Sequence, residues 1–317
     1  MNTDQSDKEG KFLSVLSVIS GAHFRRPRQA KAHRTPPHRK RLKMTRPVKR
    51  VVTFAVLFCF LLMIHRPAQN QSLKPGPSVV RAQHGMVATS QPLASQVGIE
   101  VLKRGGNAVD AAIAMAAMLN VTEPMMTGIG GDMFALVYWA KTKELKGLNA
   151  SGRAPRSLSP EYFNKKNIKQ MPLRGMGSIT VPGAFDGWAT LLDKYGTMTL
   201  ADLLAPAIDY AENGFPLMEK TAEDWKAEVD VLKRTPASAE NYLVNGRAPR
   251  AGEIFRQPNL ARTLRSLAAG GRDAFYKGPI AKAIADYMQA NGGFITLDDL
   301  AATKSEWVEP ISTNYRG

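Results

Sequence analysis

The stretch RGGNAVDAAIAMAAMLNVTEPMMTGIGGDMFALVYWA, residues 104–140, decides which fold this sequence can adopt. Asn107 follows two glycines and is placed to cap a helix over 108–120. Small apolar side chains occupy almost every face of that helix, which predicts burial against close neighbours. Apolar residues resume at 134–140 in a pattern typical of a strand. We therefore expect a buried helix and a strand joined by the glycine-rich loop GIGGD at 128–132.

The GIGGD loop does not have the context of a phosphate-binding loop. A dinucleotide fingerprint needs a strand, the glycines and then a helix whose amides face the phosphates. Here the helix precedes the glycines and the strand follows them. We interpret the loop as a tight turn that lets two backbones approach closely. We expect Asp132 to accept hydrogen bonds from loop amides and Asp110 to cap its helix or pair inside the fold.

Helical and extended patterns alternate through the body of the chain, residues 83–317. A second strand is expected at 144–150, and Phe134, Tyr138 and Trp139 are interpreted as core or substrate-wall side chains. An extended pattern starts again within 310–317. Helices are expected at 93–106, 186–196, 199–214, 221–234, 259–271, 280–293 and 296–302. No internal repeat interrupts this order, so we expect one domain of the α/β or α+β class.

The net charge of +16 is concentrated at the amino terminus. Residues 1–50 contain 14 of the 43 lysines and arginines against three acidic residues. We expect residues 1–43 to be a basic disordered tail, or to precede a true translation start at Met44. The body has a much weaker excess of positive charge, so we expect no nucleic acid partner.

An apolar run, VVTFAVLFCFLLMI at 51–64, follows the cationic MTRPVKR at 44–50. Fourteen uncharged residues are too few for an ordinary membrane span and match the apolar region of a secretory signal. We expect 44–66 to be a signal peptide or an uncleaved signal anchor, and 67–82 to be a linker. The protein is then exported to the periplasm or outside the cell, and an uncleaved anchor would tether it to the membrane by 51–64.

Cysteine and histidine are too sparse for several kinds of active site. Cys59, the single cysteine, lies inside the apolar run, so the body has neither a disulfide nor a thiol nucleophile. Four of the five histidines lie between residues 23 and 65, and only His84 belongs to the body. A Ser-His-Asp triad or a histidine-based zinc site would depend on that one residue, so we expect neither.

An ordered series of motifs resembles the large-subunit segment of the gamma-glutamyltransferase family, the gamma-glutamyl transpeptidases. The most specific is VLKRGGNAVDAA at 101–112, and GIGGDMF follows it at the family's spacing. RAP at 153–155 and ITVPGAFDGW at 179–188 match the next two motifs. The series continues with similar blocks at 192–215, 273–302 and 310–317. The resemblance covers roughly residues 80–317.

This resemblance implies an N-terminal-nucleophile hydrolase with a four-layer αββα sandwich, of α+β class, made as a precursor that cleaves itself. Cleavage exposes a threonine whose own amine acts as the general base, so no metal or organic cofactor is required. In the family this threonine lies downstream of the position of Gly317. We therefore expect this chain to be an incomplete, helix-rich large-subunit portion that is inert alone. Its expected partner is the small subunit from the same precursor.

Two substrate-binding residues are predicted next to the RAP motif. Glutamate-specific members have an Arg-Glu pair just before Ala-Pro, and alignment on Ala154-Pro155 places Ser151 and Gly152 at those positions. Arg153 is displaced by two positions but can still offer its guanidinium to a substrate carboxylate. The alternative is an arginine at a strand end that pairs with an acid elsewhere.

The resemblance implies an enzyme that cleaves gamma-glutamyl amides such as glutathione and transfers the acyl group to water or an amino acid. SGRAP, together with GIGGD where glutathione-type members more often have GGGG, suggests a side branch that acts on a different amide. A second alternative is a non-catalytic tethered remnant, a binding module with the same fold.

Overall fold

The computed structural model describes residues 13–16 and 80–317. The chain divides into two compact units, residues 1–22 with 84–317 and residues 23–83, and every described helix and strand belongs to the first. The predicted signal segment and almost all of the predicted linker lie outside the described residues. Among the described residues, no helix is long and apolar enough to cross a membrane.

The main sheet is antiparallel, with the strand order β1-β2-β3-β6. Strands β2 (Met133–Trp139) and β3 (Glu144–Ala150) form the predicted hairpin. The outer strands β1 (Leu13–Leu16) and β6 (Glu306–Val308) pair with β2 and β3, respectively.

The two outer strands differ from what the sequence indicated. Strand β1 lies within the segment 1–43 and pairs with the open edge of β2, and the rest of that segment lies outside the described residues, so its prediction as a disordered tail is not tested. The strand expected within 310–317 is instead β6 at Glu306–Val308, and residues 310–317 form no regular element. Pro310 has no N–H to donate to a ladder, which is consistent with the strand's ending before it.

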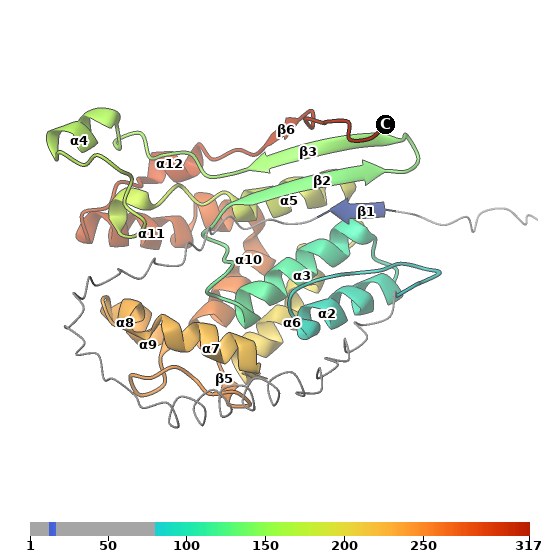
Figure 1. Cartoon of the computed structure of the whole chain (residues 1–317), viewed down its shortest axis with the longest axis horizontal. Helices are drawn as coiled ribbons and strands as arrows, with labels where there is room; N and C mark the ends of the chain where they lie inside the picture. Colours follow the sequence, from blue (N-terminus) through green and yellow to red (C-terminus); the bar gives the residue numbers. More distant parts are fainter. Residues whose placement is uncertain (1–12, 17–79) are drawn as a thin grey trace, which may run out of the picture. The chain divides into compact units, whose positions relative to one another are not determined.

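Helices pack against one side of the sheet (Figure 1). Helix α5 (Ala184–Tyr195) contacts both β2 and β3, and α3 (Ala108–Thr122) packs against α5. Helices α2 (Pro92–Lys103) and α6 (Leu200–Asn213) pack against α3, and α10 (Pro258–Tyr276) packs against α6. This helical layer and the inward side chains of the sheet form one apolar core.

Helix α3 is held at its start by the motif predicted to cap it. The Asn107 side chain accepts hydrogen bonds from the amides of Val109 and Asp110, and the Asp110 carboxylate accepts one from the Asn107 amide. The same buried carboxylate also accepts from the Thr197 amide at 2.9 Å and the Thr197 hydroxyl at 2.5 Å. The prediction that Asp110 has an internal structural role is confirmed.

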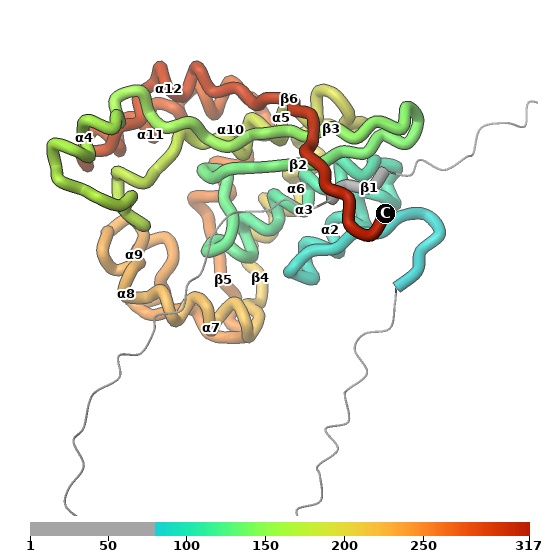
Figure 2. The backbone as a smooth tube through the Cα atoms, turned by 45° about the horizontal axis from the view of Figure 1, so that its top comes forward, coloured from blue at the N-terminus to red at the C-terminus, as the bar shows by residue number. Residues whose placement is uncertain are grey.

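Smaller elements lie at two other places in the same unit. Figures 1 and 2 show helices α7, α8 and α9 gathered with strand β5, away from β3 and β6. These elements are α7 (Glu219–Ala227), α8 (Val229–Leu232), α9 (Pro236–Tyr242) and the ribbon of β4 (Phe215–Pro216) with β5 (Ile254–Phe255). The second group contains α4 (Pro160–Lys165), the 3-10 turn η1 (Met176–Ser178), α11 (Pro279–Ala290) and α12 (Leu297–Ala301).

Candidate functional site

The GIGGD loop, residues 128–132, is a turn that fastens the start of α5. The Gly131 amide donates to the Gly128 carbonyl at 3.0 Å and closes the turn. The Gly131 carbonyl accepts hydrogen bonds from the amides of Gly183 at 3.0 Å and Ala184 at 2.9 Å. The loop lies after the end of α3 and before β2, so no helix begins at its glycines. The interpretation as a turn is confirmed.

Asp132 connects this loop to two others. Its Oδ1 accepts a hydrogen bond from the Gly152 amide at 2.8 Å and a longer one from the Thr180 hydroxyl at 3.5 Å. Gly152 is tightly enclosed, because a β-carbon there would lie 1.8 Å from the Val181 carbonyl oxygen. The prediction that Asp132 bonds loop amides is confirmed.

The segment SGRAPR at 151–156, which we call the SGR turn, is held from several directions. At its start, the Ser151 amide donates to Asn149 Oδ1 at 2.9 Å. In its centre, the Arg153 carbonyl accepts from the Val181 amide at 2.9 Å. Together with the Asp132 contact, these bonds fix the backbone at three successive residues.

The far end of the SGR turn is held by Asp299 of α12. The Arg156 amide donates to Asp299 Oδ1 at 3.2 Å, and the other carboxylate oxygen accepts from the hydroxyl and amide of Thr296. Burial of the Asp299 carboxyl opposes its ionisation, but the bonds from Thr296 and Arg156 outweigh it and lower its pKa. An ionised Asp299 therefore anchors the turn at neutral pH.

The two predicted substrate-binding residues lie on this anchored turn. Ser151 and Arg153 are both exposed, and 75% of the Arg153 side chain is accessible to solvent. The Arg153 guanidinium makes an ion pair with Glu306 of β6, whose side chain is 53% exposed. The contact follows from the sheet, because Asn149 lies opposite Glu306 in the β3–β6 register.

Glu306 is itself preceded by an anchored residue. The Ser305 amide and hydroxyl donate to Asp186 Oδ2 at 2.6 and 2.5 Å, and Asp186 is 1% exposed. Arg272 of α10 donates to the other oxygen of Asp186 and to the Thr303 carbonyl. These bonds join strand β6, which carries Glu306, to the start of α5 and to α10.

A buried tyrosine completes this anchor. The Tyr276 hydroxyl accepts from the Asp186 amide at 3.0 Å and donates to the Pro182 carbonyl at 2.9 Å. Burial raises the pKa of the Tyr276 hydroxyl far above its ordinary value, so it remains a neutral donor. Its role is structural, because it lies inside the core and holds the segment before α5.

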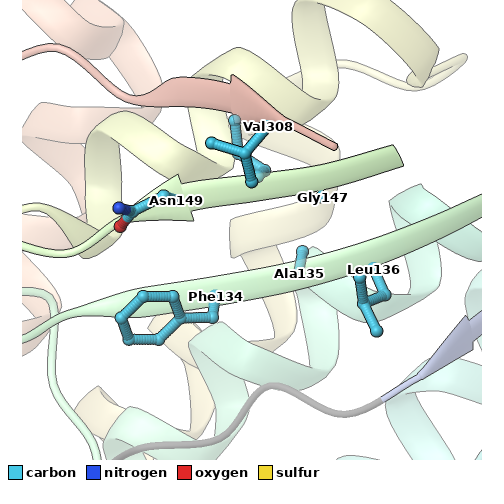
Figure 3. A pocket seen from close by; sticks show the side chains of 7 residues that line it. Phe134, Ala135, Leu136, Gly147, Asn149 and Val308 are labelled. Atoms are coloured by element: carbon cyan, nitrogen blue, oxygen red, sulfur yellow. The ribbon is translucent and has the colours of Figure 1, made fainter. Parts of the chain in front are cut away.

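The outward face of the sheet is apolar and exposed. Figure 3 shows a shallow hollow on it, lined by Phe134, Ala135, Leu136, Gly147, Leu148, Asn149 and Val308. Phe134 is 44% exposed and Tyr138 36% exposed, which excludes a core position for both and leaves the substrate-wall alternative as a prediction. Strand alternation directs Met133, Ala135 and Val137 inward instead. Trp139 is half-buried and stacks on Tyr195, with ring centroids 5.0 Å apart.

The hollow has one polar side chain, Asn149, among its lining residues. Within residues 13–16 and 80–317, no group of three or more His, Cys, Asp and Glu side chains could hold a metal ion.

Sequence reasoning missed Glu306, the partner of Arg153, and the anchors Asp186 and Asp299. Glu306 lies 153 residues from Arg153 in the chain, so no local pattern connects them. The alternation in SEWV at 305–308 was the available signal for a strand. For Asp299 the available signal was clear, because TLDD at 296–299 has the spacing of a capping box. That spacing does not indicate the contact between Asp299 and the Arg156 amide.

Comparisons with known proteins place the chain in a family. The family model described as Gamma-glutamyltranspeptidase matches residues 94–317. The "Glutathione hydrolase-like YwrD proenzyme" of Bacillus subtilis is 43% identical over 233 residues, which cover 73% of this chain and 44% of that protein. This chain thus spans less than half of the length of that relative.

Solved structures give the same result. The cephalosporin acylase from Bacillus halodurans superposes with a TM-score of 0.69 at 45% identity, covering 77% of this chain and 48% of the acylase chain. Helicobacter pylori gamma-glutamyltranspeptidase superposes with a TM-score of 0.72 at 34% identity, covering 75% of this chain and 69% of that chain.

The mixed fold and its neighbours define the class, an α+β protein of the N-terminal-nucleophile hydrolase type. Within this class, the chain belongs to the gamma-glutamyltranspeptidase family. The resemblance in the motifs and the predicted α+β class are both confirmed.

Proposed function

We propose that this chain is the acyl-recognition portion of an amidohydrolase or acyltransferase precursor, and that Arg153 binds a carboxylate on the acyl group of the substrate. The observation that carries the proposal is the SGR turn. Its backbone is fixed by Asn149, Asp132, Val181 and Asp299, yet it presents an arginine to solvent. Holding the backbone while exposing a guanidinium is what a preorganised carboxylate site needs.

The proposed reaction is transfer of an acyl group from an amide. A threonine hydroxyl attacks the amide carbonyl, and the threonine's own α-amine takes the hydroxyl proton and passes it to the amide nitrogen of the substrate. The C–N bond breaks, the substrate nitrogen leaves as an amine, and the acyl group remains on the threonine as an ester. Water or an amino acid then takes the acyl group. The threonine would come from the part of the precursor that follows the region matched here, since YwrD is a proenzyme of more than twice the matched length. This chain alone would then be inert.

The leading substrate class is a gamma-glutamyl amide such as glutathione. A second candidate is an amide with a different acyl group. The 45% identity to a cephalosporin acylase favours this alternative, as does Ser151-Gly152 in place of the Arg-Glu pair of glutamate-specific members. In both cases we propose the same role for Arg153.

The proposed partner is the small subunit from the same precursor, packed on the outward face of the sheet. Phe134, Leu136, Tyr138, Leu145 and Val308 are all between 36% and 45% exposed there. An apolar strand face of this size is ordinarily covered in a finished domain. Covering it would place the small subunit next to Asn149 and the SGR turn.

We also propose that the protein is exported. The apolar run that suggests export lies outside the described residues, so this proposal rests on the sequence alone. The apolar run 51–64 behind a cationic segment supports a signal peptide or a signal anchor. Cell fractionation of the expressed protein tests this: recovery in the cytosolic fraction, uncleaved, would contradict it.

The catalytic proposal is tested on the precursor that contains this chain together with its small-subunit segment. We expect two bands on a denaturing gel and release of chromophore from γ-glutamyl-p-nitroanilide. Arg153→Gln should raise KM about 10- to 100-fold, the loss expected for a charge-assisted hydrogen bond, with a smaller effect on kcat. Arg262→Gln, at an exposed arginine of α10, is the matched control and should leave KM unchanged.

Other outcomes separate the alternatives. Cleavage of the precursor without chromophore release would favour an amide with a different acyl group. A single uncleaved band without turnover would favour the non-catalytic tethered module. Full activity with an unchanged KM in Arg153→Gln would remove the role proposed for Arg153.

A further inference from the structure

The guanidinium of Arg153 already has a carboxylate partner within the chain. Arg153 and Glu306 form an ion pair across the end of the sheet, although 153 residues separate them. Both side chains are more than half exposed, so the pair lies at the surface where a substrate would arrive. In the chain without substrate, Glu306 therefore occupies the group that is proposed to bind the substrate carboxylate.

The pairing is built in by the backbone on both sides. On one side, the Gly152 amide is bonded to Asp132 and the Arg153 carbonyl to the Val181 amide. On the other, Ser305 is bonded to the buried Asp186 through both its amide and its hydroxyl. Two anchored backbones bring the side chains together, so less conformational entropy is lost in forming the contact.

An exposed ion pair of this kind is weak enough to be displaced. Such pairs change an equilibrium constant by about fivefold or less, because water screens both charges. A planar guanidinium has five N–H donors and can take an incoming carboxylate in a two-bond arrangement. When a substrate carboxylate binds to Arg153, Glu306 would lose its ion pair with the guanidinium. The negative charge of Glu306 would also repel the incoming carboxylate.

We propose that Glu306 determines specificity by competing with the substrate carboxylate for Arg153. It lowers the affinity of the site for negatively charged acyl groups and so shifts the preference toward acyl groups without a carboxylate. This inference rests on the proposed role of Arg153, and it adds a residue on β6 that tunes that role.

The test uses the 317-residue chain and needs no catalytic activity. Phenylglyoxal modifies accessible guanidinium groups, and mass spectrometry of the peptide that contains Arg153 reports the rate. Glutarate, a dicarboxylate, is the protecting ligand, and glutaramide, its neutral diamide, is the control ligand. Glu309→Gln is the matched control variant, because Glu309 is also exposed and pairs with Lys146 instead.

We expect the modification of Arg153 in Glu306→Gln to be about two- to fivefold faster than in the unchanged chain. The glutarate concentration that halves modification should fall by a similar factor, while glutaramide protects neither protein. Glu309→Gln should behave like the unchanged chain. Thermal unfolding should be unaltered in both variants, since both glutamates are exposed.

The remaining outcomes separate this inference from the proposed function. Equal protection by glutarate in all three proteins would leave Arg153 as a carboxylate-binding residue and would overturn the competition by Glu306. Weaker protection in Glu306→Gln would overturn it as well, because Glu306 would then assist binding. Absence of protection in every protein would overturn both this inference and the role proposed for Arg153.

Discussion

Two aspartates, one in the first turn of α3 and one beyond its end, both accept backbone hydrogen bonds but lie in opposite surroundings. Asp110, at the start of the helix, is fully buried and accepts hydrogen bonds from Asn107, Thr197 and Met198. Asp132, beyond its end, is exposed and holds the amide of Gly152.

The difference shows which part of the motif series maintains the fold and which part shapes a surface. The bonds to the buried Asp110 join the start of α3 to the segment between α5 and α6, so they cannot be exchanged for bonds to water. The bond to Asp132 fixes the SGR turn, in which Ser151 and Arg153 remain exposed to solvent. The motif that contains Asp110 is therefore specific in sequence because it holds the core together, and it need not lie near a substrate.

The largest expected effect comes from breaking the buried anchor. Asp110→Ala leaves the amides of Asn107 and Thr197 without their acceptor and should lower the free energy of unfolding by about 3 kcal/mol. Asp202→Ala is the matched control, because Asp202 holds the same third position in α6 but is exposed. It should cost about 0.5 kcal/mol. Urea unfolding of the 317-residue chain measures both, and equal losses would refute the distinction.

A smaller global effect with a clear local one is expected at the exposed anchor. Asp132→Ala should lower the free energy of unfolding by less than about 1 kcal/mol. Hydrogen exchange of the Gly152 amide should nevertheless become at least about tenfold faster, because its acceptor is gone. Asp230→Ala, at an exposed aspartate of α8, should leave that exchange rate unchanged. An unaltered Gly152 rate in Asp132→Ala would show that the bond does not hold the turn.

The smallest effect concerns Glu253, a half-buried acid whose partner is charged. The side-chain hydrogen bond from Arg247, with the Arg250 amide, lowers the pKa of Glu253 to about 2 from 4.5. Because the pKa is lowered in the folded chain, the stabilisation is present above pH 4.5 and is lost as the pH falls toward 2. The unchanged chain should exceed Glu253→Gln in urea midpoint at pH 7, and the gap should close across that range. A gap that is constant with pH would contradict the assignment.

Local signals were sufficient for most helices. Asn107 caps α3 as predicted, Thr296 caps α12 within the predicted helix 296–302, and Gly214, with a φ of +92°, ends α6. Thr199 caps α6 by accepting from the Asp202 amide, although the reciprocal bond of a full capping box is not part of that cap. These features depend on residues within one turn of each other, which is why a sequence pattern reveals them.

Long-range contacts were beyond the reach of pattern. Strand β6 has three residues and is defined by its partner β3, which lies more than 150 residues away. Strand β2 was predicted, but the sequence left open whether Phe134 and Tyr138 lie in the core or on a substrate wall. The fold decides this, because it places both side chains on the exposed face. Arg153 and Ser151 were located from a motif, while the glutamate that faces Arg153 depends on the fold.

The close contact at Gly152 has a consequence for protein engineering. Any side chain at this position would collide with the Val181 carbonyl, a backbone atom that cannot rotate away. Its neighbours Ser151 and Arg153 are exposed and can be varied without disturbing packing. A library aimed at new acyl groups should therefore keep Gly152 constant and randomise the two positions beside it, together with Glu306.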